Sequence, residues 1–199
     1  MNIAVDCDNV ILDTFPAMRD FYHDAIDSSA EINPLDHPDT WPVFGGDRSV
    51  WLKFLDDFNH SPYFVRPRPI EGAINGLRRI KSLGHGLYVL FAASKDKEVR
   101  EARKAHMDAI APALFSDVLC IDSDDESKGE VAARRGFGVL IDDSGKHIQS
   151  ALDHGLSAIW LKRPANEKEF GEAAPRPGLF LAEGWDDVVE TIAKADAVK

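Results

Sequence analysis

Short runs of apolar residues alternate along this chain with longer segments that have helical spacing. The apolar runs cover residues 3–5, 87–91, 118–121, 139–141 and 158–161. Runs that are apolar at every position are typical of parallel strands buried on both faces of a sheet. Strand-like runs separated by helical segments indicate βαβ units. We therefore expect an α/β fold with a doubly wound, mainly parallel sheet.

The segments between and after these runs carry apolar stripes at the spacing of an α-helix. The clearest stripe runs from residue 70 to residue 80, and Gly84 is a suitable residue to end that helix. Further stripes cover residues 148–152 and 188–192. These stripes predict the helices that cover the two faces of the sheet.

One region interrupts the alternation with two helical patterns and no clear strand. Thr14 is a suitable N-cap for the first of these helices and Asp47 for the second. We expect a small helical cap at residues 14–69, inserted after the first strand. The α/β core is then formed by residues 1–13 and 70–199.

Composition and charge exclude several classes of protein. The 199 residues include 23 Lys and Arg against 34 Asp and Glu, a formal net charge of −11. Such a surface repels phosphate backbones, so we expect no nucleic-acid partner. No apolar run reaches the roughly 20 residues that span a bilayer, and the first residues lack the pattern of a signal peptide. We expect no membrane partner and a cytoplasmic location.

Acidic residues follow two of the expected strands. Asp6 and Asp8 come at the end of the first strand, and Asp142 and Asp143 at the end of the fourth. Ligands of α/β folds collect at the carboxyl ends of strands, and positions i and i+2 of an extended chain face the same side. Four neighbouring carboxylates repel one another unless a hard divalent cation lies between them. The pattern therefore predicts a Mg²⁺ site.

A hydroxyl and a lysine follow the other two strands. Ser94 comes after the second strand, and Lys128 opens a helical segment after the third. Carboxylates, a hydroxyl, a lysine and a cation together are the parts of phosphoryl transfer through an aspartyl phosphate. Each residue alone has an ordinary interpretation as a turn former, an N-cap or a solvated side chain. Their order at successive strand ends favours the chemistry.

This ordered set resembles the haloacid dehalogenase-like (HAD) hydrolase superfamily and, within it, the 5'(3')-deoxyribonucleotidase group. The resemblance extends from residue 3 to about residue 185. Its most specific stretches are IAVDCDNVILDT at 3–14 and GVLIDDSGKHIQSALDHGLSAIWL at 138–161. The resemblance implies a HAD-like Rossmannoid core and a Mg²⁺-dependent phosphomonoesterase. It also implies a small phosphorylated substrate, a nucleoside monophosphate.

The resemblance implies a role for each motif residue. Asp6 is the nucleophile that becomes phosphorylated, and Asp8 protonates the leaving alcohol and later activates water. Lys128 stabilises the charge on Asp6 and on the phosphate. Asp6, the backbone carbonyl of Asp8 and Asp142 hold Mg²⁺, with Asp143 in support.

The phosphate-binding hydroxyl of the second motif has two interpretations. The second strand runs into Ala92, Ala93 and Ser94, and we favour Ser94 as the phosphate contact because predicted strand ends shift by a few residues. If an alanine occupies the motif position, the hydroxyl is missing. That second case motivates an alternative from another class, a degraded relative that binds phosphate or Mg²⁺ without hydrolysis.

The substrate has few signals in the sequence. Caps of this kind supply the discriminating contacts, and the aromatic residues able to stack on a base are Phe15, Trp41, Phe44 and Trp51. Arg66 and Arg68 are able to meet a second anion, although a core or surface role is the commoner fate of such residues. A non-nucleotide phosphoester stays an alternative. We also expect a homodimer, because dimers are common.

A response-regulator receiver domain uses similar residues in a different order. A receiver carries its acidic pair after the first strand and a lone phospho-acceptor Asp after the third. Here the second acidic pair, Asp142 and Asp143, follows Lys128 on the fourth strand. This order argues against a receiver.

Overall fold

A six-stranded parallel sheet forms the centre of the molecule, for which a computed structural model describes residues 1–32, 41, 43–44, 47–93, 96–121 and 126–197. The strand order is β5-β4-β1-β6-β7-β8, and every pair of neighbours is parallel. The strands are β1 (Asn2–Val5), β4 (Gly86–Ala92), β5 (Asp117–Ile121), β6 (Val139–Asp142), β7 (Ser157–Leu161) and β8 (Leu179–Ala182). The five strands predicted from apolar runs are confirmed, and the expected α/β fold with them.

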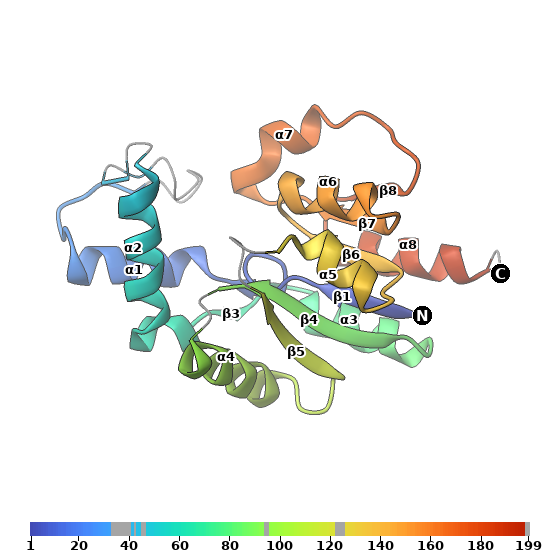
Figure 1. Ribbon diagram of the computed structural model, residues 1–199, viewed down its shortest axis with the longest axis horizontal. Helices are drawn as coiled ribbons and strands as arrows, with labels where there is room; N and C mark the ends of the chain where they lie inside the picture. The colour runs from blue at the N-terminus through green and yellow to red at the C-terminus, as the bar shows by residue number, and fades with distance from the viewer. Residues whose placement is uncertain (33–40, 42, 45–46, 94–95, 122–125, 198–199) are drawn as a thin grey trace.

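Helices cover both faces of this sheet, as Figure 1 shows. Alternate residues of a strand point to opposite faces, so Ile3 and Val5 pack on one face and Ala4 on the other. The first face is covered by α3 (Ala73–Ser82), α4 (Lys97–Ile110) and α8 (Trp185–Ala197). The second is covered by α5 (Lys128–Arg134), α6 (Gly145–Asp153) and α7 (Glu167–Gly171), the last preceded by the 3₁₀ turn η3 (Pro164–Asn166).

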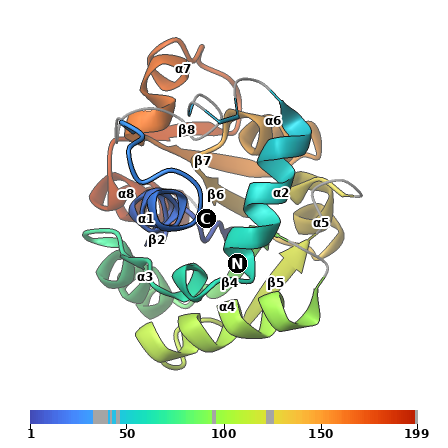
Figure 2. The same cartoon turned by 90° about the vertical axis from the view of Figure 1, so that its left-hand side faces the viewer.

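The chain leaves the sheet after β1 and forms two helices before it returns to α3. These are α1 (Phe15–Ala25) and α2 (Arg48–Asn59), followed by the 3₁₀ turn η2 (Pro62–Val65). Figure 2 shows both helices in front of the sheet. The exit and return form a two-stranded antiparallel ladder, β2 (Leu12–Asp13) with β3 (Arg68–Pro69). The exact domain limits, 14–69 for the cap, stay a prediction.

Two local expectations in the cap are decided by hydrogen bonds. The Asp47 side chain accepts from the backbone N–H groups of Ser49 and Val50, so Asp47 caps α2 as predicted. Thr14 stands at the N-cap position of α1, but its side chain makes no capping hydrogen bond. The Thr14 hydroxyl donates to Asp8 instead. The prediction of a capping role for this side chain was wrong, because its oxygen caps no backbone N–H of α1 and its hydroxyl is bound to the Asp8 carboxylate.

Two features of the fold escaped the sequence patterns. The edge strand β8 has two exposed apolar residues, Phe180 and Leu181, and no continuous buried run. The two-residue strand β3 lies inside the region where no strand was expected.

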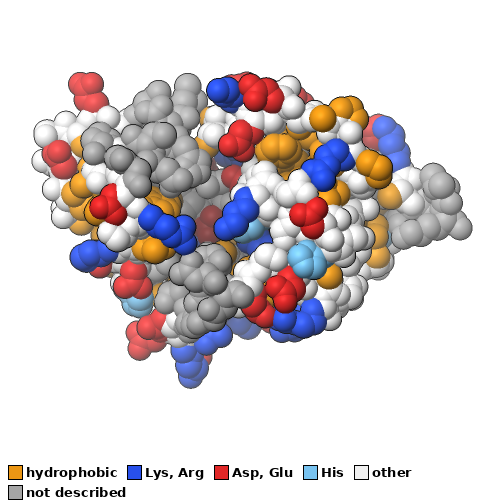
Figure 3. Space-filling view, turned by 45° about the horizontal axis from the view of Figure 1, so that its top comes forward, with side chains coloured by type: hydrophobic (Ala, Val, Ile, Leu, Met, Phe, Trp, Pro, Cys, Tyr) orange, Lys and Arg blue, Asp and Glu red, His pale blue; other side chains and the backbone are white. Residues whose placement is uncertain are grey.

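Among the described residues, no helix has the length and apolar character needed to cross a membrane. Acidic and basic side chains are interspersed over the face seen in Figure 3.

Candidate active site

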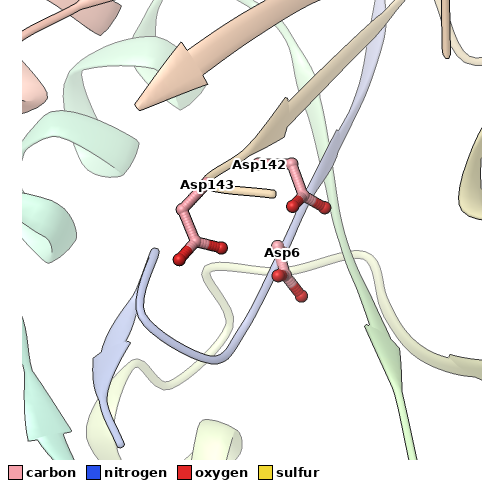
Figure 4. Close-up of side chains that lie close together, drawn as sticks. All are labelled: Asp6, Asp142 and Asp143. Carbon is pink, nitrogen blue, oxygen red and sulfur yellow. The ribbon is translucent and has the colours of Figure 1, made fainter. Parts of the chain in front are cut away.

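Three carboxylates meet at the carboxyl edge of the sheet. Asp6 follows β1, and Asp142 and Asp143 end β6 and begin the next loop. Because β1 and β6 are neighbours, with Val5 opposite Ile141, the residues after them come together. One oxygen of each carboxylate lies within 4.8 Å of the others. Figure 4 shows the three side chains close together.

Lys128 is buried beneath this cluster and bridges two of its members. Its Nζ lies 2.6 Å from Asp6 Oδ1 and 2.8 Å from Asp142 Oδ2. Lys128 begins α5, and the next residue, Gly129, packs against α6. A Cβ at position 129 would overlap the backbone carbonyl of Ser150. The close approach of α5 to α6 thus depends on glycine and sets where Lys128 points.

Burial and mutual repulsion perturb the protonation of the cluster. Burial, reinforced by the Asp142 carboxylate, raises the pKa of Asp6 well above its ordinary value, even with Lys128 beside it. The same causes raise the pKa of Asp143 to about 7. Burial alone would lower the pKa of Lys128, but the Asp142 and Asp6 carboxylates raise it above normal. The lysine is therefore cationic, and the raised pKa values of Asp6 and Asp143 mean that ionisation of all three carboxyls needs a further cation.

The Asp8 side chain is not one of the three carboxylates whose oxygens lie within 4.8 Å of one another, although it lines the same cavity as Asp6. β1 ends at Val5, and the chain turns through Asn9, whose φ of 57° is left-handed. Asn is one of the few residues that adopts this conformation readily. The turn carries Asp8 toward Thr14 and Arg103, whose Oγ1 and Nη2 lie 2.7 and 2.9 Å from Asp8 Oδ1. The role expected for the Asp8 backbone carbonyl stays a prediction.

Arg103 is a residue of this site that the sequence interpretation missed. Its side chain is fully buried, although it is an arginine on a helix that packs on the outside of the sheet. The available signal was its position: Val99, Arg103 and Met107 follow at intervals of four and form the buried stripe of α4. A charged residue on such a stripe indicates a buried ion pair.

A cavity of about 760 Å³ lies between the cap and the carboxyl edge of the sheet. Asp6, Asp8, Lys128 and Asp143 line it from the core. From the cap, the lining includes Phe15, Met18, Trp51, Leu55 and Phe58. The volume falls within the range typical of small-molecule sites.

The aromatic residues proposed as substrate contacts divide into two pairs. Phe15 and Trp51 line the cavity and are partly exposed. Trp41 and Phe44 do not line it; they are 3% and 1% exposed and pack on Tyr22 and Phe54 inside the cap.

The remaining candidates lie elsewhere. Arg66 and Arg68 are exposed and outside the cavity lining, and the Arg66 guanidinium lies over the Tyr63 ring. Ser94 lies outside the described residues, so its assignment as the phosphate-binding hydroxyl stays a prediction. Its neighbours Ala92 and Ala93 line the cavity.

The loop after β6 adds groups that the sequence did not single out. The backbone carbonyl of Asp143 accepts from Trp160 Nε1 and Asn166 Nδ2, at 2.8 and 2.7 Å, which fixes the loop beside the cavity. His147 also lines the cavity, and burial together with the Lys128 charge lowers the pKa of its imidazole to about 4. His147 is therefore neutral near pH 7.

The donor set of the cluster fits a hard divalent cation. It consists of three carboxylates, and Mg²⁺ and Ca²⁺ prefer oxygen ligands of this kind. Lys128 offsets only one of the negative charges. The cavity gives space beside Asp6 and Asp143 for the water or phosphate oxygens that complete the shell of Mg²⁺.

No family model and no curated protein matches it. Many solved structures do. A haloacid dehalogenase-like hydrolase from Streptococcus pneumoniae has a TM-score of 0.70 at 10% identity, covering 96% of this chain and 97% of its own. A predicted phosphatase from Clostridium acetobutylicum has a TM-score of 0.71 at 15% identity, covering 97% and 98%.

A third structure was determined with ligands. It is a HAD family hydrolase from Deinococcus radiodurans with bound phosphate and sodium, and it has a TM-score of 0.65 at 13% identity over 98% of this chain and 96% of its own. Identities this low establish similarity of fold. The chain therefore has the haloacid dehalogenase-like α/β fold, with a helical cap near its N-terminus.

Proposed function

We propose that this protein is a Mg²⁺-dependent phosphomonoesterase that acts through an aspartyl-phosphate intermediate. The observation that carries the proposal is the arrangement of Asp6: its carboxylate lines the cavity, contacts the buried Lys128 and belongs to the three-carboxylate cluster. A nucleophile, a cation and a metal-binding set thus share one space. The fold that the chain shares with a predicted phosphatase and with a hydrolase that holds bound phosphate supports the same conclusion.

Asp6 is held in a way that suits nucleophilic attack. Its Oδ1 accepts from the backbone N–H of Cys7 at 2.7 Å and contacts Lys128 Nζ at 2.6 Å. In the described part of the chain, Oδ2 has no hydrogen-bond partner, so this oxygen is left to attack. When bound at the cluster, Mg²⁺ would neutralise charge on the transferring phosphoryl group.

The chemistry then proceeds in two displacements. Asp6 attacks the phosphorus, the bond from phosphorus to the leaving oxygen breaks, and the protonated Asp8 carboxyl gives its proton to that oxygen. Asp8, now a carboxylate, takes a proton from water as that water attacks the phosphoryl group. The Asp6–phosphorus bond breaks, and inorganic phosphate leaves. Lys128 stabilises the negative charge that the phosphoryl group carries in both steps.

The proposed substrates are small phosphoesters, with nucleoside monophosphates as the first class to test. The cavity has room for a molecule of that size. Phe15 and Trp51 line its cap side, where a flat base is able to stack on an aromatic ring. The nucleotide assignment rests on the sequence resemblance together with this lining.

Hydrolysis of p-nitrophenyl phosphate with Mg²⁺ tests the proposed reaction. We expect turnover by the wild-type protein and its loss in Asp6→Asn. Asp20→Asn, an exposed residue of α1, is the matched control and should retain full activity. Absence of turnover on every phosphoester tried, together with measurable phosphate or Mg²⁺ binding, would support the non-hydrolysing alternative instead.

A substrate panel tests the class of substrate separately. It should include 5'- and 3'-nucleoside monophosphates, deoxynucleotides and sugar phosphates. We expect nucleotides to have the highest kcat/KM. Good turnover of sugar phosphates with failure of every nucleotide would overturn the nucleotide assignment and leave the phosphatase proposal intact.

A further inference from the structure

Arg103 is a fully buried cation that connects three parts of the molecule. It belongs to α4 in the core, yet its guanidinium reaches Asp8 in the turn after β1, with Nη2 2.9 Å from Asp8 Oδ1. Its Nη1 donates to the backbone carbonyl of Phe64 in η2, at 3.2 Å. The guanidinium also lies 3.9 Å from the centre of the Phe64 ring. The last segment of the cap and the turn that carries Asp8 therefore share one arginine.

This geometry restricts how the Asp8 carboxylate is oriented. Its Oδ1 accepts from both Arg103 and Thr14, whose side chain is also buried. Two donors on one oxygen fix the rotation of the carboxyl group about its bond to Cβ. Asp8 itself is 31% exposed in its side chain and lines the cavity. Among the described residues, the other oxygen, Oδ2, has no hydrogen-bond partner and is the one left to exchange a proton.

Lysine would not reproduce this arrangement. An arginine fork donates in two directions within a plane and stacks flat on an aromatic ring, whereas an ammonium group is a single strongly hydrated point. At position 103 one guanidinium nitrogen donates to the Asp8 carboxylate and the other to the Phe64 carbonyl. Within the described part of the chain, Asp8 is the one carboxylate paired with this buried charge, and burial of a charge with a single partner is costly for a purely structural role.

We infer that Arg103 is a positioning residue for proton transfer by Asp8. It does not touch the reacting phosphorus; it holds Asp8 Oδ1 so that Oδ2 faces the leaving oxygen in the first step and the water in the second. This inference rests on the proposed phosphatase function. It predicts that removal of Arg103 slows only those reaction steps in which a proton is transferred.

Leaving groups of different basicity separate this role from a structural one. The phosphorus–oxygen bond of p-nitrophenyl phosphate breaks without protonation, because p-nitrophenolate is a stable anion. An alkyl phosphate needs a proton on the leaving oxygen. In Arg103→Gln we expect kcat/KM for glycerol phosphate, or for the best alkyl ester of the panel, to fall about 100-fold, the scale of a general-acid contribution. For p-nitrophenyl phosphate we expect a fall of less than about threefold.

The second step gives an independent readout. Asp8 also activates the water that hydrolyses the aspartyl phosphate, so Arg103→Gln should accumulate the phosphorylated protein. We expect a burst of p-nitrophenol that approaches one equivalent of protein, followed by slow steady-state turnover. Wild-type protein should show a smaller burst. Arg100→Gln, an exposed arginine of the same helix, is the matched control and should behave as wild type.

Two further variants keep the test valid if Arg103→Gln does not fold. Arg103→Lys retains a cation and should show the same selective loss to a smaller degree. In Arg103→Ala, added guanidinium should restore alkyl-ester turnover more than p-nitrophenyl phosphate turnover. Equal losses on both ester classes in variants that fold, with no burst, would overturn the inference alone. A wild-type protein without turnover would overturn the proposed function and this inference with it.

Discussion

The carboxyl edge of the sheet and the interior of the cap both contain buried side chains, but of opposite kinds. At the sheet edge, Asp6 and Asp142 converge on the buried Lys128. Inside the cap, aromatic rings pack on one another, with Phe54 in contact with the rings of Tyr22, Phe44, Trp51 and Phe58.

The two regions therefore depend on different forces. The cluster at the sheet edge consists of groups that are costly to bury and are held for chemistry. The cap interior consists of groups that gain from burial and hold a shape. Substitutions in the two regions should therefore have different effects. Those at the sheet edge should lower the reaction rate, and those in the cap interior should lower the stability of the fold.

Removal of Lys128 is the change with the largest expected effect. Lys128→Met should lower kcat by about a thousandfold, since the charge on Asp6 and the phosphoryl group loses its cation. The loss of one partner from a buried ion pair should also lower the free energy of unfolding by about 3–5 kcal/mol without Mg²⁺. Kinetics and denaturant unfolding measure the two effects. A variant with near wild-type kcat would remove Lys128 from the proposed mechanism.

Truncation of a side chain in the cap interior should have the opposite result: a loss of stability with the reaction chemistry retained. Phe54→Ala should lower the free energy of unfolding by about 3–5 kcal/mol through loss of buried contacts. Folded Phe54→Ala should still react with p-nitrophenyl phosphate and Mg²⁺ at low temperature. Val50→Ala, an exposed position of α2, should change stability by less than about 0.5 kcal/mol. Complete loss of chemistry in the folded protein would show that the two regions are not separable.

The pH dependence of stability sharpens the account of the acidic cluster. Asp143 has a pKa of about 7 in the folded protein against 3.8 as a free side chain, so between these values the folded state binds more protons than the unfolded chain. Without Mg²⁺, the free energy of unfolding should therefore fall as the pH rises toward about 7. Thermal unfolding at several pH values measures the trend.

Added Mg²⁺ should reverse that trend. At a concentration 100 times its Kd, a ligand adds about 2.7 kcal/mol of stability, and the gain should be larger at pH 8 than at pH 5 because the carboxylates are then ionised. Asp143→Asn should weaken both the pH trend and the Mg²⁺ effect. Equal stabilisation at both pH values would contradict the assignment of the cluster as the metal site.

The smallest expected effect concerns the cavity wall. Trp51→Ala should raise KM for a nucleotide about tenfold, or about 1.4 kcal/mol, and leave kcat nearly unchanged, because a stacking contact is the same in the ground and transition states. Trp51→Phe keeps a ring and should have a smaller effect. Steady-state kinetics on both variants checks this. An unchanged KM in Trp51→Ala would exclude a base-stacking role.

The sequence predicted the sheet and the acidic residues at its carboxyl edge because both depend on local pattern. Asp6, Lys128 and Asp142 follow or end elements that can be recognised from apolar runs, and parallel strands bring such positions to one edge. The placement of Asp8 could not be predicted in this way. It depends on the left-handed turn at Asn9 and on Arg103, which is 95 residues away in the chain.

The aromatic residues of the cap show the same limit. The sequence alone does not distinguish four of them, because a large ring at a helical position suits either a core or a pocket: Phe15, Trp41, Phe44 and Trp51. The packing of the whole cap buries Trp41 and Phe44 and leaves Phe15 and Trp51 beside the cavity. The edge strand β8 was missed although its four residues are all apolar, because a short apolar run does not by itself identify a strand.

The contact between Gly129 and Ser150 has a consequence for mutational tolerance. Every other amino acid adds at least a Cβ, which would overlap the Ser150 carbonyl and move α5 together with the lysine that begins it. A survey of all single substitutions, scored by activity, should therefore rank position 129 among the least tolerant in the protein. Gly129 would then rank with the residues essential for activity, although it has no side chain that could take part in a reaction.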